Sequence, residues 1–245
     1  MSAKQTELFT KNSKTVLSLD FDRRGSCVQF CDYCYVDNME RIYPAYLNKI
    51  QRNNSWVKTE PDKFALQLDK EYQKARRSKS KTLAGLDKMP VRIYGSGDYM
   101  PEHYDALSKV DFTFYMISKN LTMPDFEDEL NKVRKLEKIT NVLLSYDNQN
   151  VKYYDDQKHL RKEDGIRFCF TGTSEDWILQ TEFNKRRFDI FFNIGKKKAD
   201  IEFNFSEPKA CPALAKRIPH DKACATCNKC WASSKTRGSS WNEIN

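Results

Sequence analysis

Short apolar runs that favour β-strands alternate with helix-like stretches along most of this 245-residue chain. Repeated strand–helix units indicate a parallel α/β sheet. Six strands are fewer than the eight of a complete barrel, so we expect an open, partial (β/α)6 parallel barrel. The predicted strands lie at residues 15–21, 91–98, 111–118, 141–147, 165–172 and 188–195. The predicted helices lie at residues 61–80, 101–110 and 124–138, each with a proline at its start.

The composition of the chain changes at about residue 206. Residues 206–245 contain no long apolar run and are dense in small, basic and cysteine residues. A segment of this kind cannot build its own hydrophobic core and needs a staple such as a metal. We therefore expect two parts, a barrel-like body at residues 1–205 and a small cysteine-rich metal-binding extension at residues 206–245.

The chain carries no signal for a membrane or for secretion. No run approaches the roughly 18 apolar residues of a membrane span, and the first residues, "MSAKQTELFTKNSK", lack the apolar core of a secretion signal. We therefore expect a cytoplasmic protein. In a reducing compartment its eight cysteines favour metal ligands or catalytic thiols over disulfides.

Three cysteines, Cys27, Cys31 and Cys34, lie close together directly after the first predicted strand. Loops at the carboxyl ends of parallel strands are where α/β folds place their chemistry. Thiolates are soft ligands that suit zinc or iron–sulfur clusters. A closed zinc site needs four ligands, so three thiols indicate an assembly with one open position. The alternative is a zinc site that a distant His103 or Cys169 completes.

With Tyr33 before Cys34, "SCVQFCDYCYVD" resembles the Cys-x3-Cys-x-aromatic-Cys motif of the radical S-adenosylmethionine superfamily. The resemblance implies a [4Fe-4S] cluster on Cys27, Cys31 and Cys34, with its open iron chelated by S-adenosylmethionine. It also implies reductive cleavage of that cofactor to a 5′-deoxyadenosyl radical, which abstracts hydrogen from a substrate. Such an enzyme needs an electron donor, for example a flavodoxin or ferredoxin. The sequence assigns no catalytic residue.

A glycine-rich stretch, "GSGD", follows the second predicted strand and comprises Gly95, Ser96, Gly97 and Asp98. It occupies the place of the superfamily segment that holds the ammonium group of S-adenosylmethionine. It departs from the commonest form, because Ser96 replaces a glycine and Asp98 replaces a glutamate. The alternative is a strand-to-helix turn in which glycine accommodates unusual backbone angles.

Polar residues also end later predicted strands. Ser118, Ser145 and Asp147 are candidates for contacts to the carboxylate or ribose hydroxyls of S-adenosylmethionine. Serine and aspartate at such positions are also common helix caps and turn formers. Cys169 alternates with phenylalanines in its strand, which favours a small core residue over a substrate-facing thiol.

The tail contains a second cysteine group, Cys211, Cys224, Cys227 and Cys230. Four cysteines form a closed set, so a metal is expected, either zinc or a second [4Fe-4S] cluster. The spacing Cys-x2-Cys-x2-Cys with a remote Cys-Pro resembles ferredoxin cluster loops and favours the cluster. Together with "KTVLSLDF" and the first cysteine group, these elements resemble the phage- and plasmid-borne gene product 88-like family. A phage-encoded member would work in the host cytoplasm.

The net charge of +8 permits an anionic partner. We expect a radical S-adenosylmethionine enzyme whose unidentified substrate is a peptide, a protein or a nucleic-acid-related molecule. The alternative is a non-enzymatic zinc protein that binds nucleic acid through a basic surface, including "KARRSKSK" at residues 74–81. A weaker alternative is an iron–sulfur electron carrier, for which the large α/β body would be superfluous.

Overall fold

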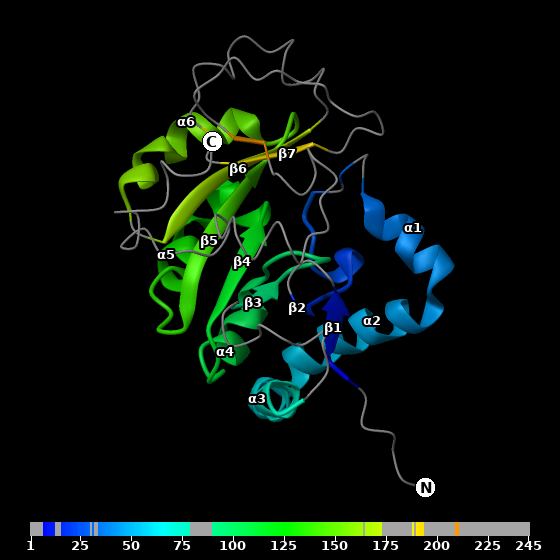
Figure 1. Cartoon of the computed structure of the whole chain (residues 1–245). Helices are drawn as coiled ribbons and strands as arrows, with labels where there is room; N and C mark the ends of the chain where they lie inside the picture. The colour runs from blue at the N-terminus through cyan, green and yellow to red at the C-terminus, as the bar shows by residue number, and fades with distance from the viewer. Residues whose placement is uncertain are drawn as a thin grey trace, which may run out of the picture.

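One mostly parallel sheet with helices on its flank forms the described part of the protein (Figure 1). The computed structural model describes residues 7–12, 16–29, 31, 34–78, 90–163, 165–172, 188, 190–193 and 209–210. In this part, no helix has both the length and the apolar character needed to cross a membrane.

The sheet has eight strands among the described residues, and their spatial order follows the sequence. The first pair is antiparallel and every later neighbouring pair is parallel. The expected mixed α/β fold with a mainly parallel sheet is confirmed, and each predicted strand range overlaps an observed strand. The strands are β1 (Phe9–Asn12), β2 (Val16–Leu19), β3 (Val91–Ile93), β4 (Phe114–Ser118), β5 (Ile139–Tyr146), β6 (Ile166–Gly172), β7 (Ile190–Asn193) and β8 (Lys209–Ala210).

Helices occupy the connections between the parallel strands from β2 to β6. Three of them lie between β2 and β3, and α2 and α3 each begin with a proline in the first turn, where its missing N–H costs nothing. The helices are α1 (Tyr35–Ile42), α2 (Pro44–Thr59), α3 (Pro61–Arg76), α4 (Tyr104–Leu107), α5 (Glu127–Val133) and α6 (Tyr154–Gln157).

The two faces of the sheet differ in character because successive side chains of a strand alternate between them. One face is apolar and belongs to the hydrophobic core with residues of α3 and α5. Its central members are Leu17, Leu19, Val91, Ile93, Phe114, Met116, Val142, Leu144, Ile166, Phe168 and Phe170. The other face carries a lateral row of Ser18, Arg92, Tyr115 and Asn141 across β2 to β5. Parallel strands are usually apolar on both faces, so this polar row is a departure that can serve a function.

The extension predicted at residues 206–245 lies outside the described residues except for β8. The two residues of β8 pair in parallel with β7. The boundary between body and extension therefore stays a prediction.

Candidate functional site

The cysteine loop connects β2 to α1. It begins with a short 3-10 helix, Arg23–Gly25, and ends with Cys34 at the N-cap position of α1. Cys27, Cys31 and Cys34 are all partly exposed, and none forms a disulfide. Burial raises the pKa of the Cys27 thiol, and the negative charges of Asp98, Cys31 and Cys34 raise it further. Cys27 is therefore affected by the charges of both other cysteines.

The three thiols of this loop have the chemistry of metal ligands. Free, partly exposed thiols are soft ligands that suit an iron–sulfur cluster or zinc. Within the described ranges, which include these three cysteines, no group of three or more His, Cys, Asp and Glu side chains has a geometry that could hold a metal. The distant residues considered for zinc have other partners. His103 Nδ1 lies 3.0 Å from the Tyr94 hydroxyl, and the buried Cys169 thiol donates to the backbone oxygen of Leu144.

The glycine-rich turn packs directly against the start of the cysteine loop. The Ser96 hydroxyl donates to the backbone oxygen of Phe21 at 3.0 Å, and the Asp98 N–H donates to the Ser26 hydroxyl at 2.9 Å. Gly97 has a φ of +73°, and a Cβ there would lie 2.7 Å from the Phe21 oxygen. Glycine is therefore required at residue 97 both by backbone conformation and by close approach.

Tyr94, which directly precedes this turn, also has a positive φ, 65°. This conformation is strained for a bulky residue. The ring is held in place because it stacks on His103, and its hydroxyl meets the His103 ring. Sequence reasoning gave no sign of this strained residue.

The Asp98 carboxylate connects the end of β3 to the end of β4. It accepts hydrogen bonds from the Ser118 hydroxyl (2.5 Å) and from the backbone N–H groups of Tyr99 (2.7 Å), Lys119 (2.9 Å) and Asn120 (3.2 Å). Burial nevertheless raises its pKa to about 6, against these four hydrogen bonds. The observed bonds give Asp98 a structural role, while its predicted contact with an ammonium group stays a prediction.

Lys119 joins the cysteine loop to the ends of two strands, and the sequence analysis missed it. Its ammonium group donates to Cys31 Sγ at 2.8 Å and forms an ion pair with Asp147. Lys119 is buried and directly follows β4, while Asp147 directly follows β5. Burial lowers the pKa of Lys119, but the charges of Cys31 and Asp147 outweigh burial and raise it overall. A lysine directly after a parallel strand was the available sequence signal.

Asn120 is a second residue that the sequence analysis missed. Its side-chain amide donates to the backbone oxygens of Ser26 (2.7 Å) and Tyr99 (2.8 Å), and its oxygen accepts from the Val28 N–H (3.2 Å). One buried side chain therefore joins the cysteine loop, the segment after β3 and the end of β4.

The remaining predicted contact residues also have structural partners. Ser118 Oγ accepts from the N–H of Leu121 at 3.1 Å, and Ser145 Oγ lies 3.4 Å from Thr171 Oγ1 on β6. Asp147 Oδ1 accepts from the N–H of Gln149 at 2.9 Å, as in a turn. The structure thus connects Asp98 to the cysteine loop directly, Ser118 through Asp98, and Asp147 through Lys119. Tyr33 and the tail cysteines Cys211, Cys224, Cys227 and Cys230 lie outside the described residues.

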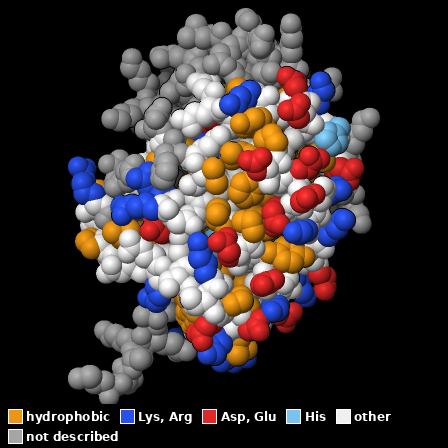
Figure 2. All heavy atoms as spheres, turned by 180° about the vertical axis from the view of Figure 1, so that it is seen from behind, with side chains coloured by type: hydrophobic (Ala, Val, Ile, Leu, Met, Phe, Trp, Pro, Cys, Tyr) orange, Lys and Arg blue, Asp and Glu red, His pale blue; other side chains and the backbone are white. Residues whose placement is uncertain are grey.

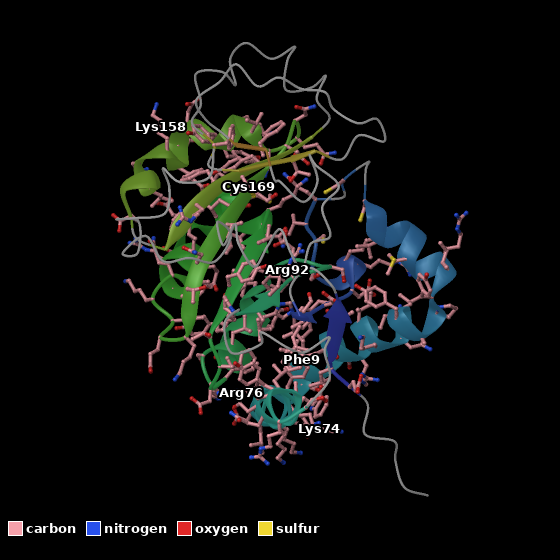
Figure 3. The ribbon with its side chains drawn as sticks, viewed as in Figure 1. Phe9, Lys74, Arg76, Arg92, Lys158 and Cys169 are labelled. Carbon is pink, nitrogen blue, oxygen red and sulfur yellow. The ribbon has the colours of Figure 1, made fainter. Side chains whose placement is uncertain are left out.

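Three described basic residues lie at the cysteine loop: Arg23 and Arg24 in its 3-10 helix, and Lys119 against Cys31. Lys74 and Arg76, from the basic stretch at residues 74–81, lie on α3 at the bottom of the view in Figure 3. On the face seen from behind, acidic and basic side chains are interspersed (Figure 2).

Comparison with known proteins identifies one family. A family model described as gene product 88 matches residues 5–233. No curated protein and no solved structure matches the chain.

Proposed function

The chain belongs to the gene product 88 family, and we propose that it is a radical S-adenosylmethionine enzyme. In this proposal Cys27, Cys31 and Cys34 hold a [4Fe-4S] cluster whose open iron binds S-adenosylmethionine. When bound, the cluster supplies the electron that cleaves the cofactor to a 5′-deoxyadenosyl radical.

One observation carries the proposal: the loop with the three thiols contacts the carboxyl ends of neighbouring parallel strands. Ser26 meets the turn after β3, and Cys31 meets the lysine after β4. Because ligands bind beyond the carboxyl ends of strands in open α/β sheets, a molecule on the open iron would lie against these residues.

The order of the strands supports the fold that this chemistry requires. In the sheet, β2 to β8 are parallel and follow one another in sequence, as the strands of a (β/α) barrel do. We therefore propose a partial barrel with the polar row of Ser18, Arg92, Tyr115 and Asn141 on its inner face.

The protein's own residues would position the reactants. Asp98 and Asn120 fix the cysteine loop against the ends of β3 and β4. The backbone of the glycine-rich turn and the hydroxyls of Ser118 and Ser145 remain candidates for contacts with S-adenosylmethionine. No residue is assigned to the hydrogen-abstraction step.

The proposal extends to the tail and to the partners. Cys211, Cys224, Cys227 and Cys230 would hold a second [4Fe-4S] cluster, or zinc as a structural alternative. A flavodoxin or ferredoxin of the cytoplasm would deliver the electron. The substrate would be a peptide, a protein or a nucleic-acid-related molecule, and the net charge of +8 permits an anion.

The second candidate, a zinc protein that binds nucleic acid, draws on the basic residues of α3. Lys74 and Arg76 belong to its last turns. Against this function, the three thiols of the cysteine loop do not by themselves form a closed zinc set of four ligands.

Metal content after purification without oxygen separates the two candidates. The proposed enzyme should be brown and contain about eight irons per chain, or about four irons plus zinc if the tail is a zinc site. Cys34→Ala should lose about four irons, whereas Cys227→Ala should keep the cluster at the cysteine loop. A colourless wild-type protein that contains only zinc would contradict the proposal and favour the second candidate.

A further inference from the structure

The contact between Lys119 and Cys31 would affect the reduction potential of a cluster on this loop. The ammonium nitrogen of Lys119 lies 2.8 Å from Cys31 Sγ, and the lysine is only 9% exposed. The reduction potential of an iron–sulfur cluster depends on net charge, solvent exposure and hydrogen bonds to its sulfurs. Partners of a ligand in this outer shell tune the metal as well as orient the ligand.

The sign of the effect follows from electrostatics. Reduction adds one negative charge to the cluster, and a neighbouring buried cation stabilises that added charge more strongly than an exposed one would. Asp147 pairs with the same ammonium group, so its carboxylate offsets part of the positive charge near the sulfur. The two residues should therefore act on the potential in opposite directions.

We propose that Lys119 sets the reduction potential of the cluster on Cys27, Cys31 and Cys34 by donating to the Cys31 sulfur, and that Asp147 limits this effect. Lys119 is then a positioning residue that acts through Cys31. This inference rests on the proposed function, because it requires a cluster on the loop.

A purely structural ion pair is the competing explanation. If Lys119 and Asp147 only fasten the ends of β4 and β5 together, removing either partner breaks the same pair. Both changes would then disturb the loop alike and would not shift the potential in opposite directions. The direction of the shift therefore separates the two roles.

The experiment is a redox titration of the iron-loaded protein without S-adenosylmethionine. Electron paramagnetic resonance monitors the reduced cluster during the titration. Omitting the cofactor removes any direct contribution of Asp147 to its binding. Lys119→Met should shift the midpoint potential of this cluster to a more negative value, and Asp147→Asn should shift it to a more positive value. Lys109→Met is the matched control and should leave the potential unchanged, because Lys109 pairs with Asp62 on the surface and precedes β4 instead of following it.

The inference is overturned if all variants share the wild-type potential, or if Lys119→Met and Asp147→Asn shift it in the same direction. If Lys119→Met fails to hold iron, Asp147→Asn alone tests the inference, because that variant keeps the lysine. The inference is overturned if the midpoint potential of Asp147→Asn is not more positive than that of the wild type. A wild-type protein that binds no cluster on this loop overturns the proposed function itself, and with it this inference. The two failures are thus distinguishable.

Discussion

The side-chain amide of Asn120 donates a 2.7 Å hydrogen bond to the backbone oxygen of Ser26, the residue before the first cysteine. The two residues are far apart in the sequence, and Asn120 is fully buried. The conformation of the cysteine loop therefore depends on a residue at the end of β4 as well as on the loop itself.

Asn120→Ala should destabilise the protein and loosen the cysteine loop. The substitution leaves the backbone oxygens of Ser26 and Tyr99 without their donor, which costs about 2–4 kcal/mol of the free energy of unfolding. Urea unfolding measures the loss, and the Val28 amide, which donates to Asn120, should exchange hydrogen faster. Asn48→Ala, at an exposed residue of α2, is the control and should change the unfolding free energy by less than about 0.5 kcal/mol. An unchanged stability in Asn120→Ala would show that the amide does not fasten the loop.

Comparing the stability of Gly97→Ala with that of Gly165→Ala separates the energetic cost of an unfavourable backbone conformation from the cost of a steric clash. Both glycines have positive φ angles, 73° and 79°, so both variants pay about 1–2 kcal/mol for an unfavourable backbone conformation. A Cβ at residue 97 would lie 2.7 Å from the backbone oxygen of Phe21, whereas the nearest atom at residue 165 is 3.7 Å away. Gly97→Ala should therefore cost roughly 1–3 kcal/mol more in thermal or urea unfolding. Equal losses would mean that the turn does not pack tightly against the loop.

The pH dependence of stability should change in Asp98→Asn. Burial raises the pKa of Asp98 from its ordinary value of 3.8 to about 6 in the folded protein. The folded state then binds a proton more readily than the unfolded state, so this group's stabilisation is present below pH 3.8 and is lost as the pH rises through 6. Asp98→Asn loses this pH-dependent contribution to the free energy of unfolding. In addition, the side-chain NH2 group of the variant lies against the backbone N–H donors that surround residue 98.

Urea unfolding of the metal-free protein at pH 4 and pH 7 tests this prediction. The destabilisation caused by Asp98→Asn should be larger at pH 4, by up to about 3 kcal/mol. A destabilisation that is smaller at pH 4 than at pH 7 would show that the four hydrogen bonds dominate over burial and lower the pKa.

The pH dependence of stability should also change in His103→Phe. Burial, with a smaller contribution from Lys58, lowers the pKa of His103 to about 3, so the folded protein keeps the ring neutral. Its contribution to stability is present above pH 6.5 and is lost as the pH falls towards 3. His103→Phe should therefore lose less stability than the wild type between pH 6.5 and pH 4.

The double variant tests the hydrogen bond between the two rings. His103→Phe leaves the buried Tyr94 hydroxyl without its 3.0 Å partner, which costs about 1–3 kcal/mol. Tyr94→Phe with His103→Phe removes both polar groups and should cost less than the sum of the two single variants. Strict additivity in unfolding free energies would contradict the contact.

The fold was predictable where the apolar pattern is strong. The strands from β2 to β7 and the helix α3 have regular apolar runs, and these were predicted. The helix α2 was missed because it buries Asn53 and Asn54, which interrupts its apolar stripe. These asparagines have partners outside their helix, since Asn53 donates to the backbone oxygens of Leu8 and Asp20. The short strand β1 offers only four residues of pattern.

The candidate site was predictable only in its motifs. Cysteine spacing and glycine pairs are local features that a sequence displays directly. The roles of Lys119 and Asn120 depend on which strand ends meet in space, because their partners are far away in the chain. The strained backbone of Tyr94 likewise follows from packing around its ring and leaves no mark in the sequence.

Formation of 5′-deoxyadenosine tests the central claim most directly. The protein is purified without oxygen, loaded with iron and sulfide, reduced with dithionite and supplied with S-adenosylmethionine. The wild type and Cys169→Ala, a buried cysteine outside the loop, should release 5′-deoxyadenosine, whereas Cys34→Ala should release none. A fully iron-loaded and reduced wild-type protein that releases none would contradict the assignment of this chain as a radical S-adenosylmethionine enzyme.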